Sequence, residues 1–201
     1  MLFSKPLLEY QKFRRGTVIN LNESIIFYNI KESKKFNPNM EYDIFLSHSY
    51  ADKDIIEELV FSLMQMKNFS FSIYIDWIED RQLKRNNVNA KTADILKARM
   101  KNCKCLLFVT SEKYSESKWM PWELGYFDGF KNKVAILPLS LNLNPEENYK
   151  GQEYLGLYPY IGVYNNNLCV YKTTDDVPSD SFSNWLNQEY KTFISEFKGF
   201  V

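Results

Sequence analysis

Residues 42–49 read YDIFLSHS, and this stretch decides the fold class. Its first six residues form a compact apolar run that ends in small polar side chains, which predicts a buried strand. Two further segments of this kind follow along the chain: 104–110 (KCLLFVT) and 133–139 (KVAILPL). Segment 69–76 (FSFSIYID) is also a predicted strand, because it alternates and is rich in β-forming residues. Strands that are apolar almost throughout are typical of a parallel sheet covered on both faces.

Amphipathic segments alternate with these strands. Asp52 can cap a helix in which apolar residues recur at helical spacing: Ile55, Ile56, Leu59, Val60, Leu63 and Met64. A second helix is expected to begin near Asn89 or Thr92, and a third to cover 115–130 with Pro121 in its first turn. The alternation predicts an α/β fold in which helices cover both faces of a central parallel sheet.

The chain divides into three predicted parts. Residues 1–40 are an N-terminal extension and linker, because 31–39 (KESKKFNPN) is polar and contains Asn-Pro. The α/β domain covers 41–165, and residues 166–201 form a C-terminal extension that holds a terminal helix.

Two more strands and that helix are expected after the fourth strand. Residues 154–161 (YLGLYPYI) predict a fifth strand and 168–171 a sixth. Asp180 or Ser181 can cap the terminal helix, which helical periodicity would dock through three aromatic residues: Trp185, Phe193 and Phe197.

The composition excludes several classes of protein. Basic and acidic side chains number 25 each, so the formal net charge is zero and the basic excess of a nucleic-acid-binding protein is missing. Three cysteines in no framework spacing argue against a secreted disulfide-linked domain and predict a cytoplasmic protein. No apolar run is long enough to span a membrane. One histidine and the pair Cys103 and Cys105 are too few for the usual metal site, so no metal is expected.

Familiar enzyme motifs are also absent. The glycines never form GxGxxG, GxxxxGK[ST] or GxSxG, which argues against a classical dinucleotide fold, a P-loop NTPase and an α/β-hydrolase. A response-regulator receiver needs an aspartate at the end of its third strand, whereas residues 108–111 read FVTS.

The predicted site lies beyond the carboxyl ends of the strands, where open α/β sheets bind ligands. Polar or aromatic side chains at that edge include Ser47, His48, Asp76 and Trp77. Each has a simpler role open to it, since such residues also end strands, cap helices and bond to loop backbone.

Four segments, in order and at these separations, resemble the TIR (Toll/interleukin-1 receptor) domain family. Residues 42–49 resemble its opening strand, and 52–53 the start of its first helix. The loop after Asp76 corresponds to its BB loop, and 118–124 (KWMPWEL) resembles the W-x-x-x-E segment of its catalytic members. The resemblance covers about residues 41–165 and implies the flavodoxin-like TIR fold.

The resemblance implies a bacterial, cytoplasmic NAD⁺-consuming enzyme of anti-phage defence, with Glu123 as its catalytic residue. Such enzymes are NAD⁺ glycohydrolases or ADP-ribosyl cyclases; NAD⁺ is their substrate, and no further cofactor or metal is needed. They assemble through contacts between TIR domains, and a downstream effector can read a cyclic product. The alternative is a non-catalytic TIR adaptor that binds other TIR domains through residues 77–89.

The chemistry of these residues fits NAD⁺ cleavage. Trp119 and Glu123 are four residues apart and would share a helix face. A glutamate can stabilise the positive charge of the oxocarbenium-like transition state that glycoside cleavage passes through. The candidate substrate-binding residues are Ser47, His48, Asp76, Trp77, Arg81 and Trp119. The alternative role for Trp119 is packing in the core, and the alternative for Arg81 is a position in a solvated loop.

Overall fold

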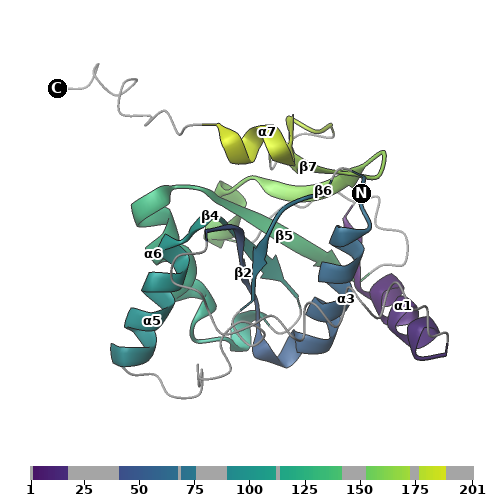
Figure 1. The fold of residues 1–201 in the computed structure, drawn as a ribbon, viewed down its shortest axis with the longest axis horizontal. Coiled ribbons are helices and arrows are strands. Elements are labelled where there is room, and N and C mark those ends of the chain that lie inside the picture. The colour runs from purple at the N-terminus through teal and green to yellow at the C-terminus, as the bar shows by residue number, and fades with distance from the viewer. Residues whose placement is uncertain are drawn as a thin grey trace.

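A central sheet divides the molecule, with helices on both of its sides (Figure 1). The computed structural model describes residues 2–17, 41–67, 69–75, 90–111, 114–141, 153–172 and 177–188. On one side lie α3 and α1, which pack against each other, and on the other lie α5 and α6. The helices are α1 (Lys5–Thr17), α3 (Lys53–Met64), α5 (Ala90–Lys101), α6 (Met120–Lys131) and α7 (Phe182–Asn187).

The strands of the sheet run in the order β3-β2-β4-β5-β6-β7-β8, and β1 pairs with β5. Neighbours from β3 to β6 are parallel, whereas β7 is antiparallel to both β6 and β8. The strands are β1 (Phe3–Ser4), β2 (Tyr42–Ser47), β3 (Ile73–Tyr74), β4 (Cys103–Thr110), β5 (Val134–Ser140), β6 (Tyr160–Tyr164), β7 (Asn167–Tyr171) and β8 (Asp180–Ser181).

The predicted α/β class is confirmed, and the sheet becomes antiparallel after β6. Asn165 and Asn166 have φ values of 49° and 58° and join β6 to β7 in a two-residue turn. Such a turn can connect only antiparallel strands, and asparagine tolerates the left-handed conformation that it requires. The hairpin of β6 and β7 extends across the predicted domain boundary at residue 165. Strand β1, which belongs to the predicted N-terminal extension, is part of the sheet. The boundaries at 40 and 165 remain predictions.

Two predicted strands are shorter in the structure. Among the described residues 69–75, Ile73–Tyr74 alone forms a ladder with β2, while Phe69 and Phe71 pack against the core. The predicted strand 154–161 is wrong over its first half, because residues Glu153–Leu157 form the short 3-10 helix η3 that precedes β6. Pro159 lies directly before β6 and lacks the N–H that a strand would donate to its neighbour.

The core has one layer on each side of the sheet, and β4 contributes to both. Cys105, Leu107 and Val109 pack in the layer with the apolar residues of α3. Leu106 and Phe108 pack in the layer with α6. This alternation follows from the two-residue period of a strand and explains why β4 is buried from Cys105 to its end.

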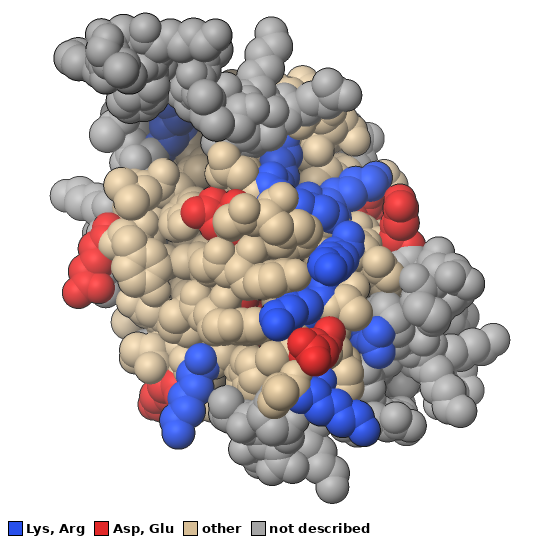
Figure 2. All heavy atoms as spheres, turned by 90° about the vertical axis from the view of Figure 1, so that its left-hand side faces the viewer, with Lys and Arg blue, Asp and Glu red and all other residues tan. Residues whose placement is uncertain are grey.

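Lysine and arginine side chains gather in a row on the face where α5 and α6 lie (Figure 2). The last turn of α5 holds Arg99 and Lys101, and that of α6 holds Lys131. The Lys131 ammonium donates to the carbonyl oxygens of Lys101, at 2.9 Å, and Cys103. Cations at a helix C-terminus satisfy its open carbonyls and interact favourably with its dipole, so Lys131 has a structural role at the end of α5.

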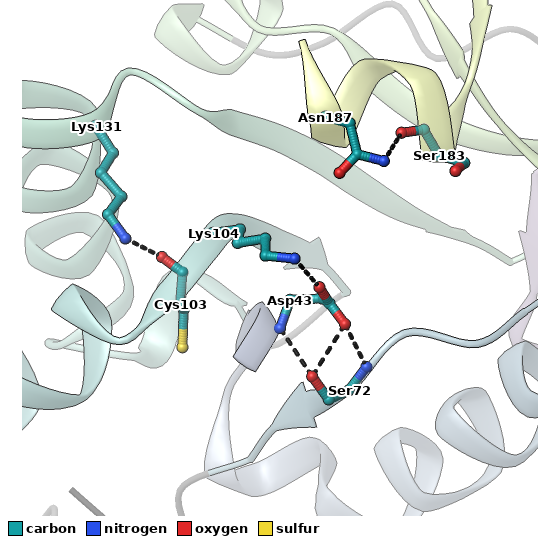
Figure 3. A network of polar contacts seen from close by, with 7 residues as sticks. All are labelled: Asp43, Ser72, Cys103, Lys104, Lys131, Ser183 and Asn187. Carbon is teal, nitrogen blue, oxygen red and sulfur yellow. Dashed lines mark hydrogen bonds and ion pairs between the residues drawn. The ribbon is translucent and has the colours of Figure 1, made fainter. Parts of the chain in front are cut away.

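A polar network ties β2 to β4 and to the segment before β3 (Figure 3). The Asp43 carboxylate accepts from the Ser72 backbone N–H at 2.8 Å and from the Ser72 hydroxyl at 3.0 Å. Its other oxygen accepts from the Lys104 ammonium at 2.8 Å. Burial raises the pKa of Asp43, but the bonds from Lys104 and Ser72 outweigh it, so this pKa lies below its ordinary value.

We expect Asp43→Asn to lower the free energy of unfolding at pH 7 by about 1 kcal/mol, because the charged hydrogen bond to Lys104 is lost. Because the pKa of Asp43 is lowered in the folded protein, its carboxylate takes up a proton more readily in the unfolded chain than in the folded one. The contribution of Asp43 is therefore complete above about pH 4 and disappears as the pH falls through the folded pKa. Urea unfolding of both proteins between pH 7 and pH 3 measures this difference. A difference that grows as the pH falls would contradict the assignment.

Candidate active site

The candidate site lies where the carboxyl end of β2 meets the first turn of α6. The start of this helix is set locally, since Pro121 occupies its first turn, where its missing N–H costs nothing. The Ser117 hydroxyl accepts from the Met120 backbone N–H at 3.3 Å. The Glu123 N–H bonds to the Trp119 carbonyl oxygen at 2.8 Å and closes the first turn.

Glu123 and Ser47 form the centre of the site. The Ser47 hydroxyl donates to Oε2 of Glu123 at 2.6 Å, and both side chains are 0% exposed. Hydrogen bonds from a hydroxyl to a carboxylate are short and strong. Glu123 also lies in the first turn of α6, where the helix dipole favours a negative charge. The arrangement can hold a carboxylate, away from bulk water, at the sheet edge where α/β folds bind ligands.

His48 follows Ser47 and is also buried, at 1% exposed. Its Nδ1 lies 2.9 Å from the carbonyl oxygen of Leu46. A carbonyl oxygen only accepts, so this contact places a proton on Nδ1 and fixes the orientation of the ring. The structure therefore brings His48 to the end of β2 beside Ser47.

Asp52 and Ser111 form a second pair of a serine with a carboxylate at this edge of the sheet. Asp52 occupies the N-cap position of α3, as expected, but its side chain makes no capping bond. The carboxylate accepts instead from the hydroxyl of Ser111, which directly follows β4. Asp52 is 5% exposed. The loop between β2 and α3 is thus fastened to the neighbouring strand.

The aromatic residues of the W-x-x-x-E segment pack closely. Trp119 is 7% exposed and belongs to the core layer of α6. Its ring meets that of Trp122 edge-on, with 5.4 Å between centroids, and Trp122 stacks on Tyr126 at 5.6 Å. Trp119 is the residue just before α6 rather than part of its face. The structure shows a packing contact for this ring, and its contact with substrate remains a prediction.

Three predicted site residues, Asp76, Trp77 and Arg81, lie outside the described residues, as does the rest of the loop up to 89. Ser47, His48 and Glu123 are brought together. Within the described ranges, no three histidine, cysteine, aspartate or glutamate side chains are grouped to hold a metal ion. No helix among these residues is long and apolar enough to cross a membrane.

Sequence reasoning missed two contacts. It named Ser47 and Glu123 separately, but their bond joins residues 76 positions apart. It did not pair Ser111 with Asp52, which are 59 positions apart. The positions of Ser47 and Ser111 at the ends of neighbouring strands were the one available signal, and it does not specify a partner.

A mostly parallel sheet flanked by helices, with a buried glutamate facing the end of its first long strand, defines an α/β protein of the TIR class. The family model described as TIR domain matches residues 44–167, and the chain belongs to this family. The resemblance of residues 42–49 and 118–124 is thereby confirmed.

Two curated relatives have names that describe an activity. The chain is 45% identical over 166 residues to "Probable 3′ cyclic ADP-D-ribose synthase ThsB′" of Bacillus cereus strain MSX-D12, covering 77% of this chain and 80% of that protein. It is 36% identical over 96 residues to a protein of Cytobacillus dafuensis provisionally named as cyclic ADP-D-ribose synthase TIR2. That match covers 47% of this chain and 24% of the relative.

Proposed function

We propose that this chain is an NAD⁺-consuming enzyme of bacterial anti-phage defence that releases nicotinamide and forms a cyclic ADP-ribose. The observation that carries the proposal is the buried Glu123 carboxylate, held by Ser47 at the ligand-binding edge of the sheet. The name of the relative that matches most of this chain supports the cyclic product. The adaptor alternative is not favoured, because both curated relatives that match this chain are named as cyclic ADP-D-ribose synthases.

The proposed reaction breaks the bond between nicotinamide and its ribose. The bonding electrons leave with nicotinamide, which departs neutral, and positive charge develops on the ribose. The negative charge of Glu123 stabilises that charge. A nucleophilic group of the same molecule then attacks the ribose carbon, loses its proton to solvent and gives a cyclic product. Attack by water, with loss of the same proton, gives ADP-ribose.

Other residues of the site have proposed binding roles. His48 lies beside Ser47 with a fixed ring, and Trp119 precedes the turn that holds Glu123. We propose both as substrate contacts, together with Asp76, Trp77 and Arg81 of the loop after β3. The reaction as proposed needs no metal and no cofactor, because NAD⁺ is the substrate and already carries a good leaving group.

The setting of the enzyme is proposed from its family. We propose a cytoplasmic homo-oligomer formed through contacts between TIR domains, whose cyclic product is read by a separate effector. Neither nucleic acid nor a membrane is proposed as a partner. Activity should then rise more steeply than in proportion to protein concentration.

The first experiment is incubation of concentrated purified protein with NAD⁺, followed by chromatography and mass determination of the products. We expect nicotinamide in equal amount to a product with the mass of ADP-ribose minus one water. ADP-ribose as the main product would keep the enzyme class and overturn cyclisation. Intact NAD⁺ at concentrations that produce assembly would overturn the proposed function.

A further inference from the structure

Ser47 has a role that the proposed reaction does not by itself assign. We infer that Ser47 is a positioning residue, whose hydroxyl holds the Glu123 carboxylate in the orientation that the reaction needs. The inference rests on the proposed function and adds to it a specific residue. The 2.6 Å bond between the two side chains, both 0% exposed, carries the argument.

Ser47 is well placed to fix another side chain. It is the last residue of β2, whose neighbours are β3 and β4, and it pairs in register with Phe108 of β4. Its chain neighbours Leu46 and His48 are each 1% exposed, so the surrounding backbone is packed on every side. The serine side chain has one χ angle to order, and its oxygen therefore has few alternative positions.

Glu123 needs such an anchor. A glutamate has three χ angles, and the last is broad, so a buried carboxylate can turn unless a partner fixes its plane. Alignment of a catalytic group is worth a large part of an enzymatic barrier, and a small displacement lowers the rate strongly. A strand-held hydroxyl on one oxygen limits that rotation. Removing the hydroxyl takes away one hydrogen bond that offsets the cost of burying the carboxylate.

The same geometry argues against Ser47 as a donor to substrate. A serine hydroxyl carries one proton, and in this structure it is directed to Oε2 of Glu123. A bond from this hydroxyl to a ribose would break the bond to the carboxylate. Ser47 should therefore affect the chemical step more than the binding of NAD⁺.

The second serine–carboxylate pair provides a matched control. Ser111 donates its hydroxyl to the Asp52 carboxylate at the end of the next strand. Ser111→Ala removes the same chemical group from the same edge of the sheet, but from a carboxylate other than Glu123. A loss of rate specific to Ser47 therefore separates positioning of Glu123 from general loosening of this edge.

The test compares steady-state NAD⁺ conversion by the wild-type protein, Ser47→Ala, Ser47→Cys and Ser111→Ala. We expect Ser47→Ala to lower kcat about 10- to 100-fold and to change KM less than about 3-fold, the rate effect of losing one hydrogen bond to a charged group. Ser47→Cys keeps the shape of the side chain with a weaker donor, so its kcat should lie between those of the wild-type protein and Ser47→Ala. Ser111→Ala should keep its rate within about 3-fold.

Several results would overturn the inference. A raised KM with unchanged kcat in Ser47→Ala would place the hydroxyl on the substrate. An unchanged rate, or an equal loss in Ser111→Ala, would remove the specific role of Ser47. If the wild-type protein leaves NAD⁺ intact, the proposed function fails, and the positioning role fails with it.

Thermal unfolding tests the bond independently of activity. Ser47→Ala and Glu123→Ala each break the Ser47–Glu123 hydrogen bond and leave one of its two buried side chains in place, whereas the double variant removes both side chains. We expect the decrease in Tm of the double variant to be clearly smaller than the sum of the two single decreases. Additive decreases would show that the two side chains are not coupled, and would overturn the inference even if NAD⁺ is turned over.

Discussion

Replacement of Glu123 by glutamine is expected to lower kcat for NAD⁺ conversion about 1000-fold, the largest effect we predict on activity. Glutamine has the shape of glutamate, and its amide oxygen can still accept from the Ser47 hydroxyl. It lacks the negative charge that stabilises the positively charged ribose in the transition state. Since the variant removes a buried charge and keeps its packing, the fold should remain stable.

The measurement is single-turnover and steady-state conversion of NAD⁺, with thermal unfolding of the same preparations. Glu116→Gln is the matched control, because Glu116 lies in the short helix η2 (Tyr114–Glu116) before α6 and is exposed. Its rate should equal that of the wild-type protein. Retained activity in a folded Glu123→Gln variant would remove Glu123 from the mechanism, whatever the product.

Truncation of Phe127 is expected to have the largest effect on stability. Phe127 is 0% exposed, packs in the core layer of α6, and lies one helical turn after Glu123. Phe127→Ala removes most of a buried aromatic side chain and leaves a cavity, which costs about 3–5 kcal/mol. The same helix carries Glu123, so a shift of α6 into the cavity should also lower activity in the fraction that remains folded.

Phe130→Ala is the control for this prediction. Phe130 lies on the same helix, 5.0 Å from Phe127 between ring centroids, but is 38% exposed. Its truncation should lower the free energy of unfolding by about 1 kcal/mol or less. Urea unfolding followed by fluorescence measures both variants. Equal losses would mean that burial on α6 does not determine its stability.

Much of the sheet could be predicted from local patterns. Continuous apolar runs identified β2, β4 and β5, because a strand buried on both faces has no polar side to alternate with. The capping of α7 was also predicted, since Ser181 accepts from the Asn184 N–H, three residues away. These features depend on residues close together in the chain.

Features that depend on distant partners were not predicted. β1 pairs with β5 across more than 130 positions, and two residues carry too little pattern to indicate a strand. The 3-10 helix before β6 was mistaken for a strand, because apolar residues in 154–161 suit either structure. Asp52 was expected to cap α3 and instead accepts from Ser111.

The sequence by itself determined the α/β class, the order of the main strands and helices, and the choice of Glu123 as the catalytic candidate. Periodicity carries the information on the fold, since it reflects the local geometry of strands and helices. The choice of Glu123 came from the resemblance of residues 118–124 to the W-x-x-x-E segment of catalytic TIR domains. Only the tertiary structure decided that Ser47 holds Glu123, because the bond forms where the end of β2 meets the first turn of α6. A contact across 76 positions is set by the packing of the sheet and helix, which no local pattern records.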